Sequence, residues 1–508
     1  MGVFQSIMSS RSYVVVPSEP TATGHFRPPK FTRRRCMASL FILAGVLTLV
    51  ALTLLAPRDL PVRAAVDELY ARQSTSLEQA AARYTLKNSR SPPPNYDRWY
   101  QFAKSSGCLI DDYDQVHRDF EPFYQLAKDD PAFFKRMVDR GTQIANTEDM
   151  GITTIKVDSG EVRMTSEWGG SLGGWLGLMQ NMSSILPDMN IVLNYREEPR
   201  VVFNPGMPDA RAGVLTSSDA TPFKHAPRPT SKYYKDAKHC IVPNEPKGFM
   251  TYGNDASSFL LYSASADFTT DLYPVMSQSK ISPCFADILF PSELHYDRSP
   301  RSSKYSFPDN VSWKYKKPLL YWRGESTGGW ISGTNYRSFP RFKVLDIARA
   351  HPEIMNVAAS GFHERFCQLD GCDAAAIKAE YNITSQESPR EEGYKYKYVL
   401  DLDGNAFSGR YLGLLKSGSL VFKSTLFTEY FSDWLRPFEH YVPVLPDLSD
   451  LVERIEWAKA NDAEARRIQA AGMEFAQRVL TDKQNDCYFA AVLLEWARLQ
   501  AGAGGAPG

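Results

Sequence analysis

The 508-residue sequence predicts an α/β fold with parallel strands covered by helices, preceded by a single membrane anchor. After about residue 290, short apolar runs alternate with helical segments, an order typical of parallel strands covered by helices. Before residue 290, the stretch ITTIKVDSGEVRM (152–164) has the pattern of a hairpin, and the apolar run MNIVLNY (189–195) predicts a further strand. An uncharged run at 36–56 predicts the anchor.

The N-terminal segment sets the expected topology. Residues 1–35 carry six Arg and Lys residues against one acid, and CMASLFILAGVLTLVALTLLA (36–56) follows without a charge. Twenty-one helical residues span roughly 30 Å, the thickness of the hydrocarbon core. Because the basic residues precede this run, residues 1–35 are expected in the cytoplasm and the remainder in the lumen of the Golgi or endoplasmic reticulum, as a single-pass type II protein. Residues 57–91 predict a helical stem.

Glycosylation sequons and cysteines agree with a lumenal location. The sequons begin at Asn181, Asn310 and Asn382. An even number of cysteines follows the anchor and predicts disulfides, although six cysteines allow 15 pairings. These cysteines are Cys108, Cys240, Cys284, Cys367, Cys372 and Cys487. Cys367 and Cys372 are close enough in the chain to close a small loop, and no Cys/His spacing is typical of a zinc site.

The overall charge argues against one class of partner. Lys plus Arg equals Asp plus Glu, 58 against 58, so no electrostatic case for nucleic-acid binding follows. The apolar and charged fractions, 43% and 23%, are ordinary for a globular protein.

The elements after residue 290 are expected in a fixed order. Strands are predicted at PLLYW (318–322), IMNVAA (354–359), YKYVLDL (396–402), SLVFK (419–423) and HYVPV (440–444). Helices are predicted at 339–350 and 410–417 and through the tail from about 448 to 500, and the last residues, 501–508, are expected to be disordered. Ligands of such sheets bind outside the carboxyl ends of the strands.

Polar side chains gather at those strand ends. The glycine-rich YWRGESTGG (321–329) could bring donors to an anion, and LDLDGNAFSGR (400–410) combines two acids with a serine and an arginine. Two further polar stretches adjoin predicted strands: SGSLVFK (417–423), with two serines and a terminal lysine, and REEP (196–199), with two acids after the apolar run 189–195. Asp401 and Asp403 could hold a divalent metal, or the hydroxyl and guanidinium groups could hold a diphosphate without metal.

These motifs, in this order, resemble the signature of glycosyltransferase family 90, which includes fungal capsule-associated xylosyltransferases and animal protein O-glucosyltransferases. The resemblance rests on YWRGESTGG, the stretch 395–423 and FTEYFSDWLRPFEHYVPV (427–444), with PPPNYDRWYQFA (92–103) and LPDMNIVLNYREEPRV (186–201) upstream. It covers about residues 92–497. It implies a GT-B-like pair of facing Rossmann-type domains, an acceptor-side domain at 92–290 and a nucleotide-sugar domain at 291–500. The implied activity is inverting transfer of xylose or glucose from a UDP-sugar to a glycan or glycoprotein hydroxyl, without a metal cofactor.

The resemblance also implies roles for individual residues. Glu197 aligns with the catalytic base, with Glu198 or Asp188 left as alternatives. Ser408, Arg410, Arg323 and Arg341 are expected on the diphosphate, helped by the helix that begins near Arg410. The other expected donor-binding residues are Gly324, Thr327, Asp403, Gly404, Ser417 and Glu429.

Three alternatives stay open at this point. His440 and Glu429 either contact the uridine ribose or support the pocket. Asp401 and Asp403 either orient the anion-binding groups or hold a metal in a metal-dependent transferase. A non-catalytic, lumenal glycan-binding protein on the same fold is the alternative from another functional class.

Overall fold

The computed structural model describes residues 60–169, 173–202, 224–225, 263, 267–269, 271–282, 284–299, 311–384 and 388–502. The predicted cytoplasmic tail and anchor, Asn310, Cys240 and residues 503–508 therefore lie outside the described residues. Within the described ranges, no helix is both long and apolar enough to cross a membrane. All the described residues belong to one unit, Arg58–Gly508.

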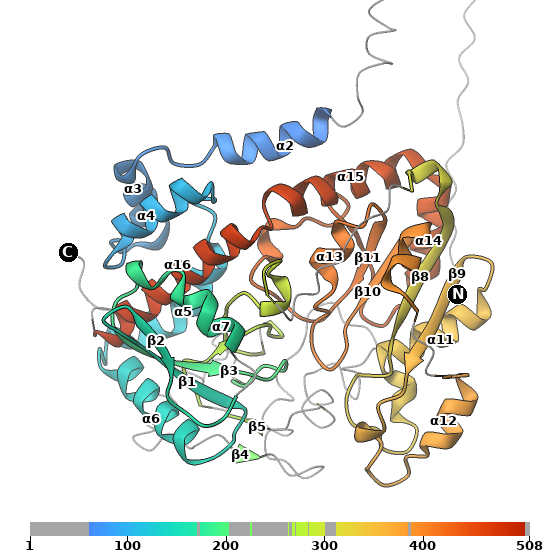
Figure 1. The fold of residues 1–508 in the computed structure, drawn as a ribbon, viewed down its shortest axis with the longest axis horizontal. Coiled ribbons are helices and arrows are strands. Elements are labelled where there is room, and N and C mark those ends of the chain that lie inside the picture. The colour runs from blue at the N-terminus through green and yellow to red at the C-terminus, as the bar shows by residue number, and fades with distance from the viewer. Residues whose placement is uncertain are drawn as a thin grey trace, which may run out of the picture. The chain divides into compact units, whose positions relative to one another are not determined.

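A five-stranded, fully parallel sheet forms the centre of the C-terminal half (Figure 1). Its order is β12-β11-β10-β8-β9. The strands are β8 (Lys317–Glu325), β9 (Met355–Gly361), β10 (Tyr396–Leu402), β11 (Leu420–Ser424) and β12 (Val442–Pro443). The chain builds β9 on one side of β8 and then returns to build β10 on the other side. The gap between β8 and β10 at the carboxyl edge is thus the topological switch point, where sheets of this kind bind ligands.

Helices cover both faces of this sheet, which explains its nearly continuous apolar strands. They are α11 (Pro340–Ala350), α12 (Ala374–Glu380), α13 (Tyr411–Leu415), α14 (Leu451–Ala460) and α15 (Asp462–Arg478). Pro340 occupies the first helical position of α11, where a missing amide proton costs nothing. Leu320, Leu400 and Phe422 are buried on neighbouring strands of one core. The α/β pattern predicted for this half is confirmed.

The N-terminal half contains a mixed sheet in the order β2-β1-β3-β6-β7. The strands are β1 (Ile152–Asp158), β2 (Glu161–Met164), β3 (Met189–Asn194), β6 (Met276–Ser277) and β7 (Ile288–Leu289). A two-stranded pair, β4 (Lys224–His225) and β5 (Asp267–Phe268), lies outside it. Strands β3, β6 and β7 are parallel, whereas β1 is antiparallel to both β2 and β3. The expectation of a Rossmann-type sheet therefore needs correction here, because a hairpin forms its outer edge.

The hairpin itself was predicted correctly. Ser159 and Gly160 have φ of 52° and 82°, and two central residues with positive φ make the type I′ turn that matches the twist of paired strands. Asp188 accepts a hydrogen bond from the amide of Ser159 at 2.7 Å and so fixes this turn.

Seven described helices belong to or lie beside the N-terminal half. They are α2 (Leu60–Ala71), α3 (Leu77–Asn88), α4 (Tyr96–Ser106), α5 (Asp114–Ala127), α6 (Phe133–Thr147), α7 (Gly173–Gln180) and α16 (Asp482–Gln500). Helix α16 comes from the far end of the chain, yet it packs against α4, α5 and α6 (Figure 1). Helix α2 packs against α15. The helices predicted for the stem are present, and the first of them is held against the C-terminal half.

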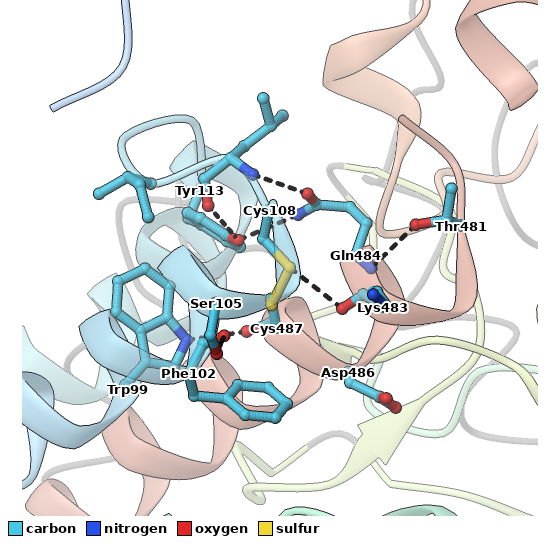
Figure 2. The surroundings of a disulfide bond; sticks show 12 residues. Trp99, Phe102, Ser105, Cys108, Tyr113, Thr481, Lys483, Gln484, Asp486 and Cys487 are labelled. Atoms are coloured by element: carbon cyan, nitrogen blue, oxygen red, sulfur yellow. Dashed lines mark hydrogen bonds between the residues drawn. A yellow bond between two sulfur atoms is a disulfide. The ribbon is translucent and has the colours of Figure 1, made fainter. Parts of the chain in front are cut away.

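A disulfide ties α16 to the N-terminal half. Cys108 is bonded to Cys487 across a sequence separation of 379 residues. Figure 2 shows Trp99 and Gln484 around this bond. The indole nitrogen of Trp99 donates to the carbonyl of Cys487 at 3.0 Å, and the amide oxygen of Gln484 accepts from the backbone of Leu109 at 2.8 Å. The small loop predicted between Cys367 and Cys372 is also closed by a disulfide.

Candidate active site

Two arginines face the ring of Trp322 at the carboxyl edge of the C-terminal sheet. Arg341 lies in the first turn of α11, and Arg410 directly precedes α13. Their guanidinium carbons are each 5.9 Å from the centroid of the buried Trp322 ring, which is a favourable place for a cation. Since α13 has only five residues, its dipole is small beside these two charges.

The hydrogen bonds of this arginine pair leave its charge uncancelled. Arg341 donates from Nη1 to the carbonyl of Glu325 at 2.8 Å and from Nε to the carbonyl of Asp403 at 3.0 Å. Arg410 donates from Nη1 to the carbonyl of Arg323 at 2.7 Å, while its buried Nη2 has no hydrogen-bond partner among the described residues. Carbonyl groups are neutral acceptors, so the arginine pair remains a site of concentrated positive charge.

The electrostatics of Arg341 reflect that concentration. Loss of surrounding water, together with the charge of Arg410, lowers the pKa of Arg341 to about 9. The negative charges of Glu197, Asp403 and Glu325 act in the opposite direction on this pKa. An anion bound between the two arginines would relieve their repulsion.

Glu197 brings the N-terminal half into this site. It follows β3 and is exposed, whereas the next residue, Glu198, is 4% exposed. The two neighbours therefore differ sharply in burial, at a bend of the chain over residues 196–198. Because the charge of Glu197 acts on the pKa of Arg341, its carboxylate lies within electrostatic range of the arginine pair. Burial raises the pKa of Glu198 to about 7.

Two of the glycines expected at the site hold close contacts. A Cβ on Gly404 would lie 2.7 Å from Nη2 of Arg341 and 2.8 Å from the hydroxyl of Thr327, so these three residues meet at one point. A Cβ on Gly324 would lie 2.6 Å from the ring of Trp322. Any side chain at either glycine would displace the arginine or the ring that it faces.

Ser408 lies in the loop that leads to Arg410. Its hydroxyl is buried and has no hydrogen-bond partner among the described residues. A buried hydroxyl without a partner suits contact with a ligand or a water molecule.

A buried cluster of acids lies around Lys423, at the end of β11. The Lys423 ammonium is 2.9 Å from Oδ2 of Asp401 and 3.6 Å from Glu429. Burial raises the pKa of Asp403 to about 7 and that of Glu429 to about 8. His295 lies 3.3 Å from Glu429, and burial lowers its pKa to about 3, so the imidazole is neutral.

This cluster bears on the metal interpretation of the two acids. Asp401 is already bound to an ammonium, and Oδ2 of Asp403 accepts from the amide of Leu426 at 2.8 Å. In the part of the chain that the structure describes, no group of three or more His, Cys, Asp or Glu residues could hold a metal ion. Glu429 supports Lys423 from inside the protein, since it is 1% exposed.

Two of the expected donor-binding side chains make hydrogen bonds to other parts of the protein. Arg323 donates to the carbonyl of Asn356 at 2.9 Å and to its side-chain oxygen at 2.6 Å, so this guanidinium is bonded to β9. Ser417 precedes β11 and therefore lies at the amino edge of the sheet, where its hydroxyl donates to the carbonyl of Leu414 at 2.6 Å. The structure therefore places Ser417 at the edge of the sheet opposite to the arginine pair.

The remaining alternatives also receive structural roles. Asp188 precedes β3, whereas Glu197 follows it, so Asp188 lies at the opposite end of that strand. His440 accepts a hydrogen bond from the amide of Arg436 at 2.9 Å, and its ring packs 4.6 Å from that of Phe475 on α15. Burial lowers the pKa of His440 to about 4.

A cavity of about 710 Å³ opens beside the arginine pair. Tyr321, Arg323 and Glu325 of β8 line one side, Arg410 another, and the loop 388–394 a third. This volume suits a nucleotide-sized ligand, and its position at the switch point is where a doubly wound sheet binds one.

The parallel sheet with helices on its faces and a cavity beside Arg410 is a doubly wound α/β arrangement, and sequence comparison identifies relatives of this half. Residues 305–503 match the model for glycosyl transferase family 90. The chain is 32% identical to protein O-glucosyltransferase 2 of Danio rerio over 180 residues, 35% of this chain and 34% of that protein. It is 31% identical to protein O-glucosyltransferase 3 of Rattus norvegicus over 193 residues, 36% and 35% of the two chains. The resemblance predicted from the motifs is thus confirmed for the C-terminal half.

The matches cover only part of each relative. With protein O-glucosyltransferase 1 of Homo sapiens the identity is 26% over 242 residues, which is 44% of this chain and 57% of that protein. The chain thus spans about a third to just over half of the length of these relatives.

Proposed function

We propose that this protein is an inverting glycosyltransferase that moves glucose or xylose from a UDP-sugar to a hydroxyl of a glycan or glycoprotein. The observation that carries the proposal is the arginine pair, Arg341 and Arg410, with the exposed carboxylate of Glu197 within its electrostatic range. The names of the O-glucosyltransferase relatives support transfer to a hydroxyl and favour glucose.

In this proposal, the reaction is a direct displacement. The acceptor oxygen forms a bond to the anomeric carbon while the bond from that carbon to the UDP oxygen breaks. Glu197 takes the proton of the acceptor hydroxyl, and UDP leaves with the electron pair. Arg341 and Arg410 stabilise the charge that develops on the diphosphate. Attack opposite the leaving group inverts the anomeric centre.

We infer that the diphosphate is held without a metal ion. The support is the ammonium of Lys423 on Asp401 at 2.9 Å, which supplies a fixed cation beside the acids that a metal would need. Asp403 and Gly404 then shape the position of Arg341 rather than binding a metal.

We also infer a lumenal location for the catalytic part, behind a type II anchor at 36–56. The disulfides Cys108–Cys487 and Cys367–Cys372 fit an oxidising compartment, and the sequon residues Asn181 and Asn382 are exposed.

The full chain should be tested with a panel of UDP-sugars, with UDP release as the readout. Slow hydrolysis of UDP-glucose or UDP-xylose is expected, and NMR should first detect the sugar anomer opposite to that of the donor. Release of the same anomer would refute inversion. Glycan binding without UDP binding would instead favour a non-catalytic glycan-binding protein.

A further inference from the structure

An acid and a histidine meet beside the arginine pair without a role in the reaction described above. Glu325 is the last residue of β8, and His363 follows the end of β9 by two residues. The Nε2 atom of His363 contacts the carboxylate of Glu325. Since β8 and β9 are adjacent parallel strands, this acid–histidine pair lies at the carboxyl edge, where the sheet binds ligands.

The backbone around the acid–histidine pair is fixed by contacts between the two loops. The amide of Ser326 donates to the carbonyl of Gly361 at 3.0 Å, and the amide of His363 donates to the hydroxyl of Ser326 at 3.1 Å. Arg341 donates to the carbonyl of Glu325 at 2.8 Å. These contacts hold both residues in place before any ligand binds, which lowers the entropic cost of binding.

The side chains, in contrast, are open to solvent. Glu325 is 56% exposed and His363 is 39% exposed. A contact between side chains so exposed contributes little to the stability of the fold, so stability does not account for a fixed pair at this edge. Glu325 also lines the 710 Å³ cavity together with Arg323 and Arg410, and its charge acts on Arg341. Glu325 thus borders both the cavity and the arginine pair, and His363 contacts Glu325 from the loop after β9.

We propose that Glu325 and His363 bind hydroxyl groups of the donor sugar, an inference that rests on the proposed function. In a UDP-sugar, the sugar is attached to the phosphate farther from the uridine. If Arg341 binds that phosphate, the sugar comes within reach of Glu325, because Arg341 donates to the backbone carbonyl of Glu325. A carboxylate accepts hydrogen bonds from hydroxyl groups, and because Nε2 of His363 contacts Glu325, Nδ1 is the ring nitrogen that would bind a sugar hydroxyl. The acid–histidine pair therefore selects and orients the sugar, while Glu197 remains the proton acceptor.

The test compares the binding of UDP with that of UDP-glucose to the full chain, by calorimetry. Glu325→Ala and His363→Ala should each weaken UDP-glucose binding about tenfold, the scale of a lost hydrogen bond to a charged group. UDP affinity should change less than about twofold, because the arginine pair is intact. In turnover assays, KM for UDP-glucose should rise more than kcat falls, and Glu325→Asp should retain more affinity than Glu325→Ala.

Glu364→Gln is the matched control. Glu364 is the neighbour of His363 and is 68% exposed, but it pairs with Lys378 at 2.7 Å and not with Glu325. This control should bind UDP-glucose as the wild type does. A thermal melt of each variant separates loss of binding from loss of fold.

Each outcome decides a different question. The same variants should also be titrated with UDP-xylose, which lacks the hydroxymethyl group of UDP-glucose. Weaker binding of UDP-glucose but not of UDP-xylose would assign the pair to that hydroxymethyl group, and equal weakening of both donors would assign it to ring hydroxyls. Unchanged UDP-glucose affinity in both alanine variants, or equal weakening of UDP and UDP-glucose, would overturn the sugar-binding role alone. A wild-type chain that binds neither UDP nor UDP-glucose would overturn the proposed function and this inference with it.

Discussion

Replacing Glu197 with Gln tests the proposed base directly. The amide keeps the shape of the side chain but cannot take the proton of the acceptor, so turnover should fall by about 10²–10⁴, or about 3–5 kcal/mol of barrier. Glu197 is exposed, so the fold should lose little stability. Its negative charge acts on Arg341, so removing it should leave UDP affinity unchanged or strengthen it at most a few fold. The measurements are UDP release during turnover and UDP binding by calorimetry.

Glu198 provides a matched control one residue away. Glu198→Gln should turn over within about threefold of the wild type, because this side chain points into the protein. Burial raises the pKa of Glu198 from 4.5 to about 7. The protonated side chain therefore contributes to the free energy of unfolding of the wild type below pH 4.5, and this contribution is lost as the pH rises to about 7, because the buried carboxyl must then ionise. That loss is about 3 kcal/mol, at 1.36 kcal/mol per pKa unit. Glu198→Gln should therefore exceed the wild type in free energy of unfolding at pH 8 but not at pH 4.

The two variants can also refute this reasoning. Exchanged phenotypes would identify Glu198 as the base. Normal turnover in both would place the base outside this segment, and Glu325 would then be the next carboxylate to replace. Weaker UDP binding in Glu197→Gln would contradict the placement of its charge beside the arginine pair.

The remaining predictions concern the anion site, the metal and the long-range disulfide. Arg410→Ala should weaken UDP binding about 10- to 100-fold by calorimetry. Arg410→Lys should bind UDP with intermediate affinity, because an ammonium cannot reproduce the planar guanidinium. Unchanged affinity in a folded alanine variant would remove Arg410 from the site. Turnover should survive EDTA, whereas loss that Mn²⁺ or Mg²⁺ restores would establish a metal site at Asp401 and Asp403. Cys487→Ser should lower the free energy of unfolding by up to about 6 kcal/mol, which is the chain-entropy value for a loop of 379 residues. An unchanged denaturation midpoint would show that packing alone holds helix α16 against the N-terminal half.

The elements of the C-terminal half could be predicted from the sequence because each strand is a short apolar run with polar residues at its end. The resulting edge brings Arg341, Arg410, Thr327 and Gly404 together, as the motifs indicated. The position of Ser417 at the amino edge also follows from the sequence, since this residue precedes its strand.

Other features depend on contacts that local sequence does not encode. The side chain of Arg323 turns to Asn356 because β9 lies beside β8, a pairing that no local pattern specifies. The position of Lys423 beside Asp401 follows from the register of β10 and β11. Trp322 stands in the sequence only as the last residue of a predicted strand, and buried His295 stands in no motif.

The packing of α16 has a consequence for the biosynthesis of the protein. Cys108 is made 379 residues before Cys487, and at about 5–20 residues per second this interval lasts about 20–75 s. Throughout that time the helices of the N-terminal half lack the partner that covers α4, α5 and α6. The loop between Cys367 and Cys372 can close locally during translation, but the long-range bond must wait for the end of the chain. The N-terminal half is therefore the first part to be synthesised and among the last to complete its core, and a prematurely terminated chain would leave it open.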